Sequence, residues 1–493
     1  MKYILAIDQG TTGTKTLLVD KNLRVVSESS FEFPQHFPKP GWVEHDCNEI
    51  WESVLRSIKK TTNGYSPSDI QAIGITNQRE TLCFWNKETG EPISRAIVWQ
   101  DRRTADICAE LKNKGAEPFF QERTGLLLDP YFSGTKATWA FQNWPEVQAA
   151  YSEGYLAAGT IDSYLIARLA GGGVHVTEPS NASRTLCFDI HRCAWNSELC
   201  QTLAVPEDIW PEVLPSTGIF AKVEGVEGIM NGTPITGVLG DQQSALLGQA
   251  CIEVGTAKCT YGTGSFLLLN TGANPIQSRH RLLSTIAWAR SLDNVTYALE
   301  GSAFIAGAAV QWLRDGLEFV KDSREIEALA NKETNTDGVV FVPALTGLGA
   351  PYWNPDARGL ITGITRGTNR AHIARAVLEG IALQNADLLT AMKKDLGKPI
   401  KQLKVDGGAA TNNLLMQFQA DMLGVDLYRP KITQTTSLGA VFAAGLGCGI
   451  WTDLAEVQKS WQEDARFSPK ISAGDKDAKL KAWARAVKMA NLA

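Results

Sequence analysis

Residues 3–20 read YILAIDQGTTGTKTLLVD, in which two apolar runs flank a turn of glycine and threonine. This pattern predicts a strand, a tight hairpin turn and a second strand. Backbone N–H groups of such a turn form a nest for anions, and Asp8 adds a carboxylate of the kind that binds Mg²⁺ beside substrate phosphates. The stretch therefore predicts a grip on nucleotide phosphates. The turn is neither a P-loop nor a Rossmann fingerprint, because the GxxxxGK[ST] and GxGxxG patterns are missing. Taken alone, these residues are explained equally well by an ordinary tight hairpin.

The composition is that of a globular protein with more than one domain. Its 493 residues exceed a typical single core, so we expect two or three domains. A net charge of −5 argues against a nucleic-acid partner. No apolar stretch approaches the ~18–20 residues of a membrane helix, and no signal-peptide pattern is present. The nine cysteines are scattered without a CxxC pair, which indicates reduced thiols and a cytoplasmic location.

Short β-rich runs alternate with helical periodicity along the chain, which predicts an α/β fold. We expect an amphipathic helix over residues 48–61 and a buried strand over residues 71–76. The second half repeats the opening theme, because residues 257–270 again read as a strand, a Gly/Thr turn and a strand. Residues 401–409 read as a further strand that ends in a glycine turn, and residues 476–492 as a final helix.

This recurrence indicates two related α/β domains that face each other, over residues 1–246 and 247–493, with the boundary near residues 245–255. Ligands of α/β proteins bind at strand ends. Three Gly/Thr turns follow predicted strands, and together they predict a nucleotide held between the domains: Gly10-Thr11-Thr12, Gly262-Thr263-Gly264 and Gly407-Gly408-Ala409.

Other polar side chains also follow predicted strands. Asp241 comes after the apolar run 235–240, where a carboxylate can take a proton from an attacking hydroxyl or cap the next helix, and the local sequence favours the cap. Arg79 and Glu80 offer a donor fork and an acceptor that suit a polyol, or form a surface ion pair of little consequence. Trp99 forms either an apolar wall of the site or part of the core.

From end to end the chain resembles the FGGY carbohydrate kinases of the actin/hexokinase/Hsp70 ATPase superfamily, and within them the branch that acts on glycerol. Ala137 and Ala140 depart from the family pattern, where larger apolar residues are usual. The matching segments are DQGTT (8–12), PKPGWVEHD (38–46), IGITNQRET (73–81), AIVWQDRRT (96–104), LDPYFSGTK (128–136), NASRT (181–185), GDQQSALLGQ (240–249), TYGTGSF (260–266), YALEG (297–301), VPALTGLGAPYW (342–353), VDGGAATNN (405–413) and SLGAVFAAG (437–445).

The resemblance implies two ribonuclease-H-like domains around an interdomain cleft. It implies ATP-dependent phosphorylation of glycerol to sn-glycerol 3-phosphate, the entry step of glycerol catabolism, with Mg²⁺ accompanying ATP. Asp241 would be the catalytic base, and Asp8 and Asp241 would serve the metal. The implied substrate positions are Arg79, Glu80, Trp99, Tyr131, Asp241, Gln242 and Phe266. The implied nucleotide positions are Thr11, Thr12, Gly13, Lys15, Thr263, Gly307, Gln311, Gly408 and Asn412.

Departures and alternatives remain within this resemblance. Gly13 and Lys15 stand where serine and arginine are usual, and lysine keeps the charge but loses the planar fork. The residues at Asn77–Glu80 favour glycerol over a five-carbon sugar, while another small polyol or ketose stays an alternative. An actin- or Hsp70-like nucleotide-switched binding protein is the alternative from another class.

Regulation and assembly are less defined by the sequence. Residues 221–236 contain no arginine, and no histidine lies between His191 and His280. We therefore expect neither fructose 1,6-bisphosphate nor phosphotransferase-system control, because a doubly anionic ligand needs concentrated positive charge or a nest. The sequence leaves a homodimer and a homotetramer open, as it does the nucleotide preference.

Overall fold

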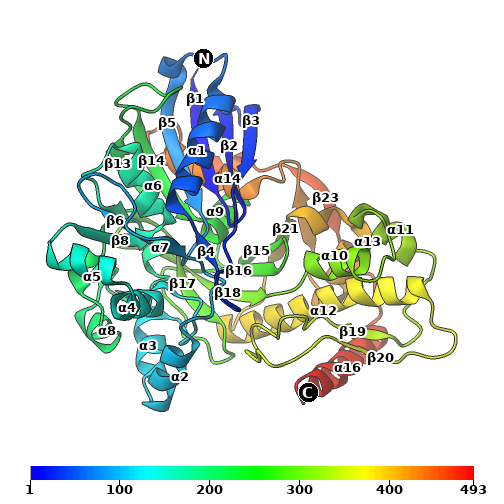
Figure 1. Cartoon of the computed structure of the whole chain (residues 1–493). Helices are drawn as coiled ribbons and strands as arrows, with labels where there is room; N and C mark the ends of the chain where they lie inside the picture. Colours follow the sequence, from blue (N-terminus) through cyan, green and yellow to red (C-terminus); the bar gives the residue numbers. More distant parts are fainter. Residues whose placement is uncertain (1, 493) are drawn as a thin grey trace.

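The computed structural model describes residues 2–492 and contains two lobes, each built on a mixed sheet (Figure 1). The sheet of the first lobe has the order β13-β14-β5-β1-β2-β3. The predicted N-terminal hairpin is confirmed, since β1 and β2 pair antiparallel with Asp8 opposite Lys15. The strands are β1 (Tyr3–Gln9), β2 (Gly13–Asp20), β3 (Val25–Glu32), β5 (Ile70–Asn77), β13 (Thr217–Lys222) and β14 (Pro234–Gly240).

The sheet of the second lobe repeats this arrangement in the order β17-β18-β16-β15-β21-β22-β23. In both sheets the first strand pairs antiparallel with the hairpin strand and parallel with the strand on its other side. The prediction of two related α/β units is therefore confirmed. The strands are β15 (Thr256–Tyr261), β16 (Ser265–Gly272), β17 (Leu283–Ser291), β18 (Asn294–Ala303), β21 (Gln402–Asp406), β22 (Leu427–Pro430) and β23 (Glu463–Phe467).

Amphipathic helices cover these sheets. Helix α1 (Cys47–Thr62) buries Ile50, Val54 and Ile58, which the helical repeat places on one face, against the first sheet. Its N-cap Asp46 accepts a hydrogen bond from the backbone N–H of Asn48. The final helix α16 (Ala473–Ala490) ends two residues before the predicted Leu492 and buries Trp483, Val487 and Ala490 in the core of the second lobe.

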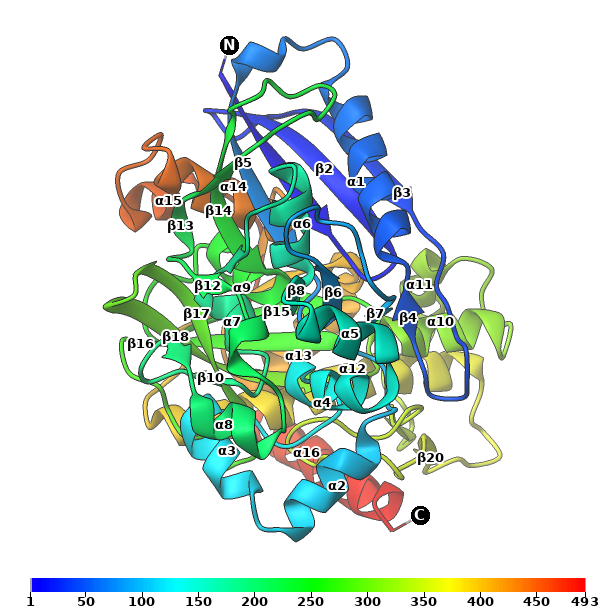
Figure 2. The same cartoon turned by 60° about the vertical axis from the view of Figure 1, so that its left-hand side comes forward.

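Helix α14 (Thr435–Gly447) belongs to the second half of the sequence but packs on the first sheet, beside β1, β5 and β14 (Figure 1 and Figure 2). Glycines allow this close approach, because an ideal Cβ at Gly74 would lie 2.2 Å from the carbonyl oxygen of Ala440. At Gly237 it would lie 2.2 Å from the backbone nitrogen of Ala444. The chain thus returns to the first lobe after building most of the second.

The connection between β5 and β14 contains a group of helices that the sequence did not predict. It also contains three strands of a small four-stranded sheet, whose fourth strand, β4, precedes β5. The elements of this region, with β4, are β4 (Glu44–His45), β6 (Leu82–Asn86), β7 (Ala96–Ile97), α2 (Ala105–Asn113), α3 (Glu117–Thr124), α4 (Ser133–Asn143), α5 (Pro145–Ser152), β8 (Leu156–Thr160), α6 (Ile161–Leu169), β9 (Val176–Thr177), α7 (Pro179–Ala182), β10 (Phe188–Asp189), β11 (Ala194–Trp195), α8 (Ser197–Thr202) and β12 (Glu212–Val213).

The other helices and strands connect or flank the two sheets. They are α9 (Asp241–Gly248), α10 (Gly307–Asp315), α11 (Ile326–Ala330), β19 (Val340–Val342), β20 (Leu360–Thr362), α12 (Arg370–Leu396), α13 (Asn413–Leu423) and α15 (Leu454–Ser460), with short 3₁₀ turns at Pro67–Asp69, Glu207–Ile209, Ser323–Glu325 and Gly408–Thr411. Within residues 2–492 no helix has the length and apolar character needed to cross a membrane. All nine cysteines are free thiols.

Candidate functional site

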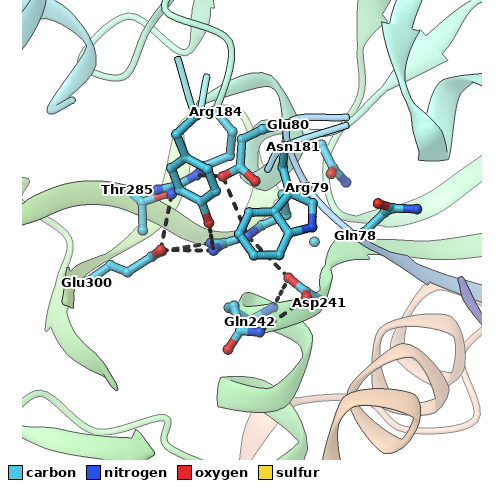
Figure 3. Close-up of polar contacts among 12 residues, drawn as sticks. Gln78, Arg79, Glu80, Asn181, Arg184, Asp241, Gln242, Thr285 and Glu300 are labelled. Carbon is cyan, nitrogen blue, oxygen red and sulfur yellow. Dashed lines mark hydrogen bonds and ion pairs between the residues drawn. The ribbon is translucent and has the colours of Figure 1, made fainter. Parts of the chain in front are cut away.

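Arg79, Glu80 and Asp241 meet because β5 and β14 are parallel neighbours whose ends lie side by side. Asn77, the last residue of β5, is the register partner of Gly240, the last residue of β14. The residues that follow these two strands therefore lie at the same edge of the sheet, the edge at which α/β proteins bind ligands. The Nε atom of Arg79 lies 3.2 Å from Oδ1 of Asp241 (Figure 3).

Asp241 is the first residue of α9, and its N-cap is Gly240, so the interpretation of Asp241 as the cap is wrong in position. Its Oδ1 atom accepts a hydrogen bond of 2.7 Å from the backbone N–H of Gln242, and its Oδ2 atom accepts one of 3.1 Å from the Gln242 amide. The side chain remains 31% exposed. Asp241 is thus a fixed carboxylate that a small molecule can still reach.

Arg79 and Glu80 are only 2% and 1% exposed, so the alternative of a surface ion pair is wrong. Both Nη atoms of Arg79 donate to the carboxylate of Glu300, at 2.7 and 2.8 Å. Nη2 also donates to the hydroxyl of Tyr131 at 3.4 Å. A buried, bidentate pair of this kind fixes the guanidinium plane, which an exposed pair does not.

Two charged residues that the sequence analysis did not assign complete this cluster. Arg184, which follows α7, donates through Nε to Oε1 of Glu80 at 2.6 Å and through Nη2 to Oε1 of Glu300 at 3.1 Å. Glu300 comes from β18 of the second lobe. Both lie in segments that carry the family resemblance, NASRT and YALEG, but no local pattern marks them, since their partners are distant in the sequence.

The two carboxylates of the cluster differ in their surroundings. Burial would raise the pKa of Glu300, but the charges of Arg184 and Arg79 and the hydrogen bonds from Arg79 lower it to about 2. Burial raises the pKa of Glu80 above its usual range, despite the neighbouring Arg79 and Arg184. Glu80 also has a φ of 59°, which is costly for a residue with a side chain and is typical of functional sites.

Aromatic residues border the cluster. Trp99 and Tyr131 pack edge to face with ring centroids 5.5 Å apart, and the Trp99 indole N–H donates to Oγ1 of Thr11 at 2.9 Å. This bond connects Trp99, the predicted apolar wall, to the N-terminal hairpin of β1 and β2. Phe266 lies on β16 of the second lobe and is half-buried.

A second buried interaction orients Gln242. Lys258, fully buried on β15, donates to Oε1 of Gln242 at 2.5 Å and to Oγ1 of Thr260 at 3.0 Å. Because its Oε1 atom accepts from Lys258, Gln242 presents its NH₂ group to Asp241. Burial lowers the pKa of Lys258 below its usual value. No local sequence pattern marks Lys258 as a functional residue.

The N-terminal hairpin holds Asp8 close to Asp241. Burial raises the pKa of Asp8 to about 6; the hydrogen bond from Ser437 opposes this shift and the charge of Asp241 adds to it. Gly13 is needed in the hairpin, because a Cβ there would lie 2.8 Å from the carbonyl oxygen of Phe31. Lys15 lies 3.7 Å from Glu28.

The donor set at this point fits Mg²⁺. Among residues 2–492, no group of three or more His, Cys, Asp or Glu side chains could enclose a metal ion. Mg²⁺ is commonly held by one or two carboxylates together with waters and substrate phosphates, and the carboxylates of Asp8 and Asp241 are of this kind.

The five predicted nucleotide positions of the second lobe line one cleft of about 590 Å³: Thr263, Gly307, Gln311, Gly408 and Asn412. A Cβ at Gly307 would lie 2.6 Å from the carbonyl oxygen of Gly262, so glycine permits the turn to pack on α10. The N-terminal N–H groups of α13 already bond to Asn412 and to Glu327. This end of the cleft therefore suits a nucleoside better than a phosphate.

Two family models match most of the chain: the FGGY family of carbohydrate kinases, N-terminal domain, over residues 3–248, and its C-terminal domain over residues 257–448. A glycerol kinase of Myxococcus xanthus is 53% identical over 494 residues, with 99% of each chain covered. A structure of Plasmodium falciparum glycerol kinase with ADP has a TM-score of 0.93 at 38% identity, covering 99% of this chain and 98% of that one. A ligand-bound xylulose kinase of Lactobacillus acidophilus, with a TM-score of 0.88 at 24% identity over 100% of this chain and 98% of its own, is alike in fold.

Proposed function

The chain belongs to the FGGY family of carbohydrate kinases, and we propose that it transfers the γ-phosphate of ATP to glycerol, giving sn-glycerol 3-phosphate and ADP. The observation that carries this proposal is the buried pair Arg79–Glu80 beside the accessible carboxylate of Asp241. A donor fork and an acceptor hold the hydroxyls of a short polyol, and a neighbouring carboxylate takes the proton of the one that attacks.

Each side chain of the polyol site has a defined task. Oε1 of Glu80 accepts from Arg184, and Oε2 accepts no hydrogen bond from any residue in the described range 2–492, so it is free for a substrate hydroxyl. Arg79 donates hydrogen bonds to the oxygens of the substrate. Trp99, Tyr131 and Phe266 cover the carbon atoms of the substrate. Asp241, aligned by Gln242, deprotonates and orients the terminal hydroxyl as it attacks phosphorus.

The nucleotide lies between the lobes in this proposal. The cleft at Thr263, Gly307, Gln311, Gly408 and Asn412 takes the nucleoside. The backbone and hydroxyls of Thr11, Thr12 and Gly13, with Lys15, hold the phosphates. Asp8 and Asp241 would hold Mg²⁺, which neutralises phosphate charge when bound. The chain's own part is to orient the phosphate opposite Asp241 and to exclude water.

A kinase for another small polyol or ketose is the second candidate, because the fold is shared with sugar kinases. The test is a coupled ADP-release assay with glycerol, erythritol, dihydroxyacetone, xylulose and water alone. We expect glycerol to give the highest kcat/KM. A higher kcat/KM with a ketose would show that the ketose, and not glycerol, is the substrate. Equal ADP release with water alone would contradict the assignment as a kinase.

The nine free thiols support a cytoplasmic location.

A further inference from the structure

We propose that Arg184 and Glu300 are positioning residues of the polyol site: they form a buried charge ring that holds Arg79 and Glu80 in the geometry that binds substrate. The proposal rests on the function proposed above and adds two residues to it. In the ring, Arg79 pairs with Glu300, Glu300 with Arg184 and Arg184 with Glu80 (Figure 3). The ring closes where Nε of Arg79 lies 3.8 Å from Oε1 of Glu80. All four side chains are at most 2% exposed.

Glu300 fixes the plane of the Arg79 guanidinium. Its two oxygens each take one Nη atom of Arg79, so the guanidinium can neither rotate nor tilt without breaking a charged hydrogen bond. The Nε edge of Arg79 is then directed at Asp241, 3.2 Å away. Glu300 thus sets the relation between the group that binds the polyol and the carboxylate that activates it.

Arg184 fixes Glu80 in the same way. It binds Oε1 of Glu80 at 2.6 Å and leaves Oε2 free of any partner among the described residues. The guanidinium also lies over the rings of Tyr131 and Phe132, with its central carbon 5.7 and 5.3 Å from the ring centroids. Arg184 is therefore held on three sides, and it determines which oxygen of Glu80 faces the substrate.

The ring joins the two lobes. Arg79 and Arg184 belong to the N-terminal half, whereas Glu300 lies on β18, seven residues before Gly307 of the nucleotide cleft. A change in the position of β18 therefore moves the partner of Arg79. Through this carboxylate the position of Arg79 depends on the second lobe.

Stability alone explains the ring poorly. A buried ion pair rarely stabilises a protein more than well-packed apolar residues do, because desolvation of the charges offsets their attraction. Two arginines and two glutamates balance in charge, so the ring can be buried, but the same volume could be filled without charge. A geometric role explains why four charges lie here.

The experiment compares Glu300→Gln, Arg184→Met and the double variant with wild type, in glycerol and ATP titrations. Glu300→Gln keeps the shape but loses the charge. We expect KM for glycerol to rise about tenfold or more in each single variant, as when one partner of a buried charge pair is removed. KM for ATP should stay within about twofold, because the nucleotide contacts are unchanged. The double variant is neutral again, so its melting temperature should recover while KM for glycerol stays high.

Glu379→Gln is the matched control. Glu379 is also nearly buried and paired, with Lys479 at 2.7 Å and Arg375 at 3.4 Å, but it lies on α12 away from the polyol site. We expect unchanged kinetics in this variant. If Glu300→Gln does not fold, Glu300→Asp keeps the charge on a side chain one methylene shorter and should raise KM for glycerol with little loss of stability.

Calorimetric titration of each protein with glycerol, without nucleotide, separates this inference from the proposed function. Wild type that binds no glycerol contradicts the proposed function. Wild type that binds glycerol and variants that bind it equally well contradict the ring. A purely structural role predicts a lower melting temperature and a smaller active fraction with KM for glycerol unchanged, and that result also overturns the proposal.

Discussion

Oδ1 of Asp241 lies 3.2 Å from Nε of Arg79 at the adjoining ends of β14 and β5. The proposed base and the residue proposed to bind the polyol therefore form an ion pair. A change to one of them is therefore expected to alter the position of the other.

Replacing Asp241 with asparagine should remove most turnover. Asparagine keeps the volume and can still accept the bond from the Gln242 backbone, but it cannot take a proton. We expect kcat to fall about 10²–10⁴-fold, the usual contribution of a general base, with little change in ATP binding. Steady-state kinetics and nucleotide titration measure the two effects. Turnover at the wild-type level in a folded variant would show that Asp241 is not the base.

Asp8 should make the folded state less stable as the pH rises, whereas a salt-bridged aspartate makes it more stable. Folding raises its pKa from 3.8 to about 6, so the folded state favours the protonated form. The stability contributed by Asp8 is present below pH ~4 and is lost as pH rises through about 6. At pH 8 without nucleotide, Asp8→Asn should therefore be more stable than wild type, by at most about 3 kcal/mol.

Urea unfolding at pH 8, 6 and 5 measures this difference. The gain from Asp8→Asn should shrink as pH falls, while Mg²⁺-dependent turnover of the variant stays low at every pH. A variant that is less stable than wild type at pH 8 would contradict the assigned burial of the charge.

Gly408→Val should weaken ATP binding without unfolding the protein. A Cβ at Gly408 would meet no atom within 4 Å, and the backbone there does not need glycine, so the new side chain enters the cleft proposed to bind the nucleotide. We expect KM for ATP to rise about tenfold and the melting temperature to stay near that of wild type. Gly367→Val, on an exposed turn with its nearest atom at 3.7 Å, is the control. Equal KM values for ATP in both variants would show that the nucleotide does not bind in the cleft beside Gly408.

Lys258→Met should lower turnover more than stability. The hydrogen-bond partners of Lys258 are the neutral Gln242 and Thr260, so removing the charge strands no buried carboxylate at hydrogen-bond distance. The Gln242 amide is then free to turn its oxygen toward Asp241. We expect kcat to fall about tenfold or more through loss of orientation, with the free energy of unfolding changed by about 1 kcal/mol or less. Unchanged kcat and KM for glycerol would assign Lys258 to packing alone.

The sequence predicts the elements of this fold better than their tertiary partners. The alternation around Asp8 and the repeat at residues 257–270 reveal the two hairpins, because strand periodicity is local. Helix α14 packs on the first lobe, and no local pattern predicts that return of the chain.

The same distinction applies to the site. From the residues alone, Arg79 and Glu80 could equally be an exposed pair, since burial is decided by segments far along the chain. Arg184, Lys258 and Glu300 stand in ordinary strand and loop sequences, and their importance arises from partners on other elements. The apolar run 235–240 correctly predicts a strand that ends just before Asp241, but the position of Asp241 in the next helix depends on backbone geometry that the sequence does not specify.

The central claim is that Arg79, beside Asp241, binds the polyol and not the nucleotide. The most direct measurement titrates Arg79→Ala with glycerol at saturating ATP and with ATP at saturating glycerol, with Arg79→Lys as the variant that keeps the charge. We predict that KM for glycerol rises about tenfold or more, because buried partners lose their charged hydrogen bonds, while KM for ATP stays within about twofold. A defect on the ATP axis alone would contradict this account.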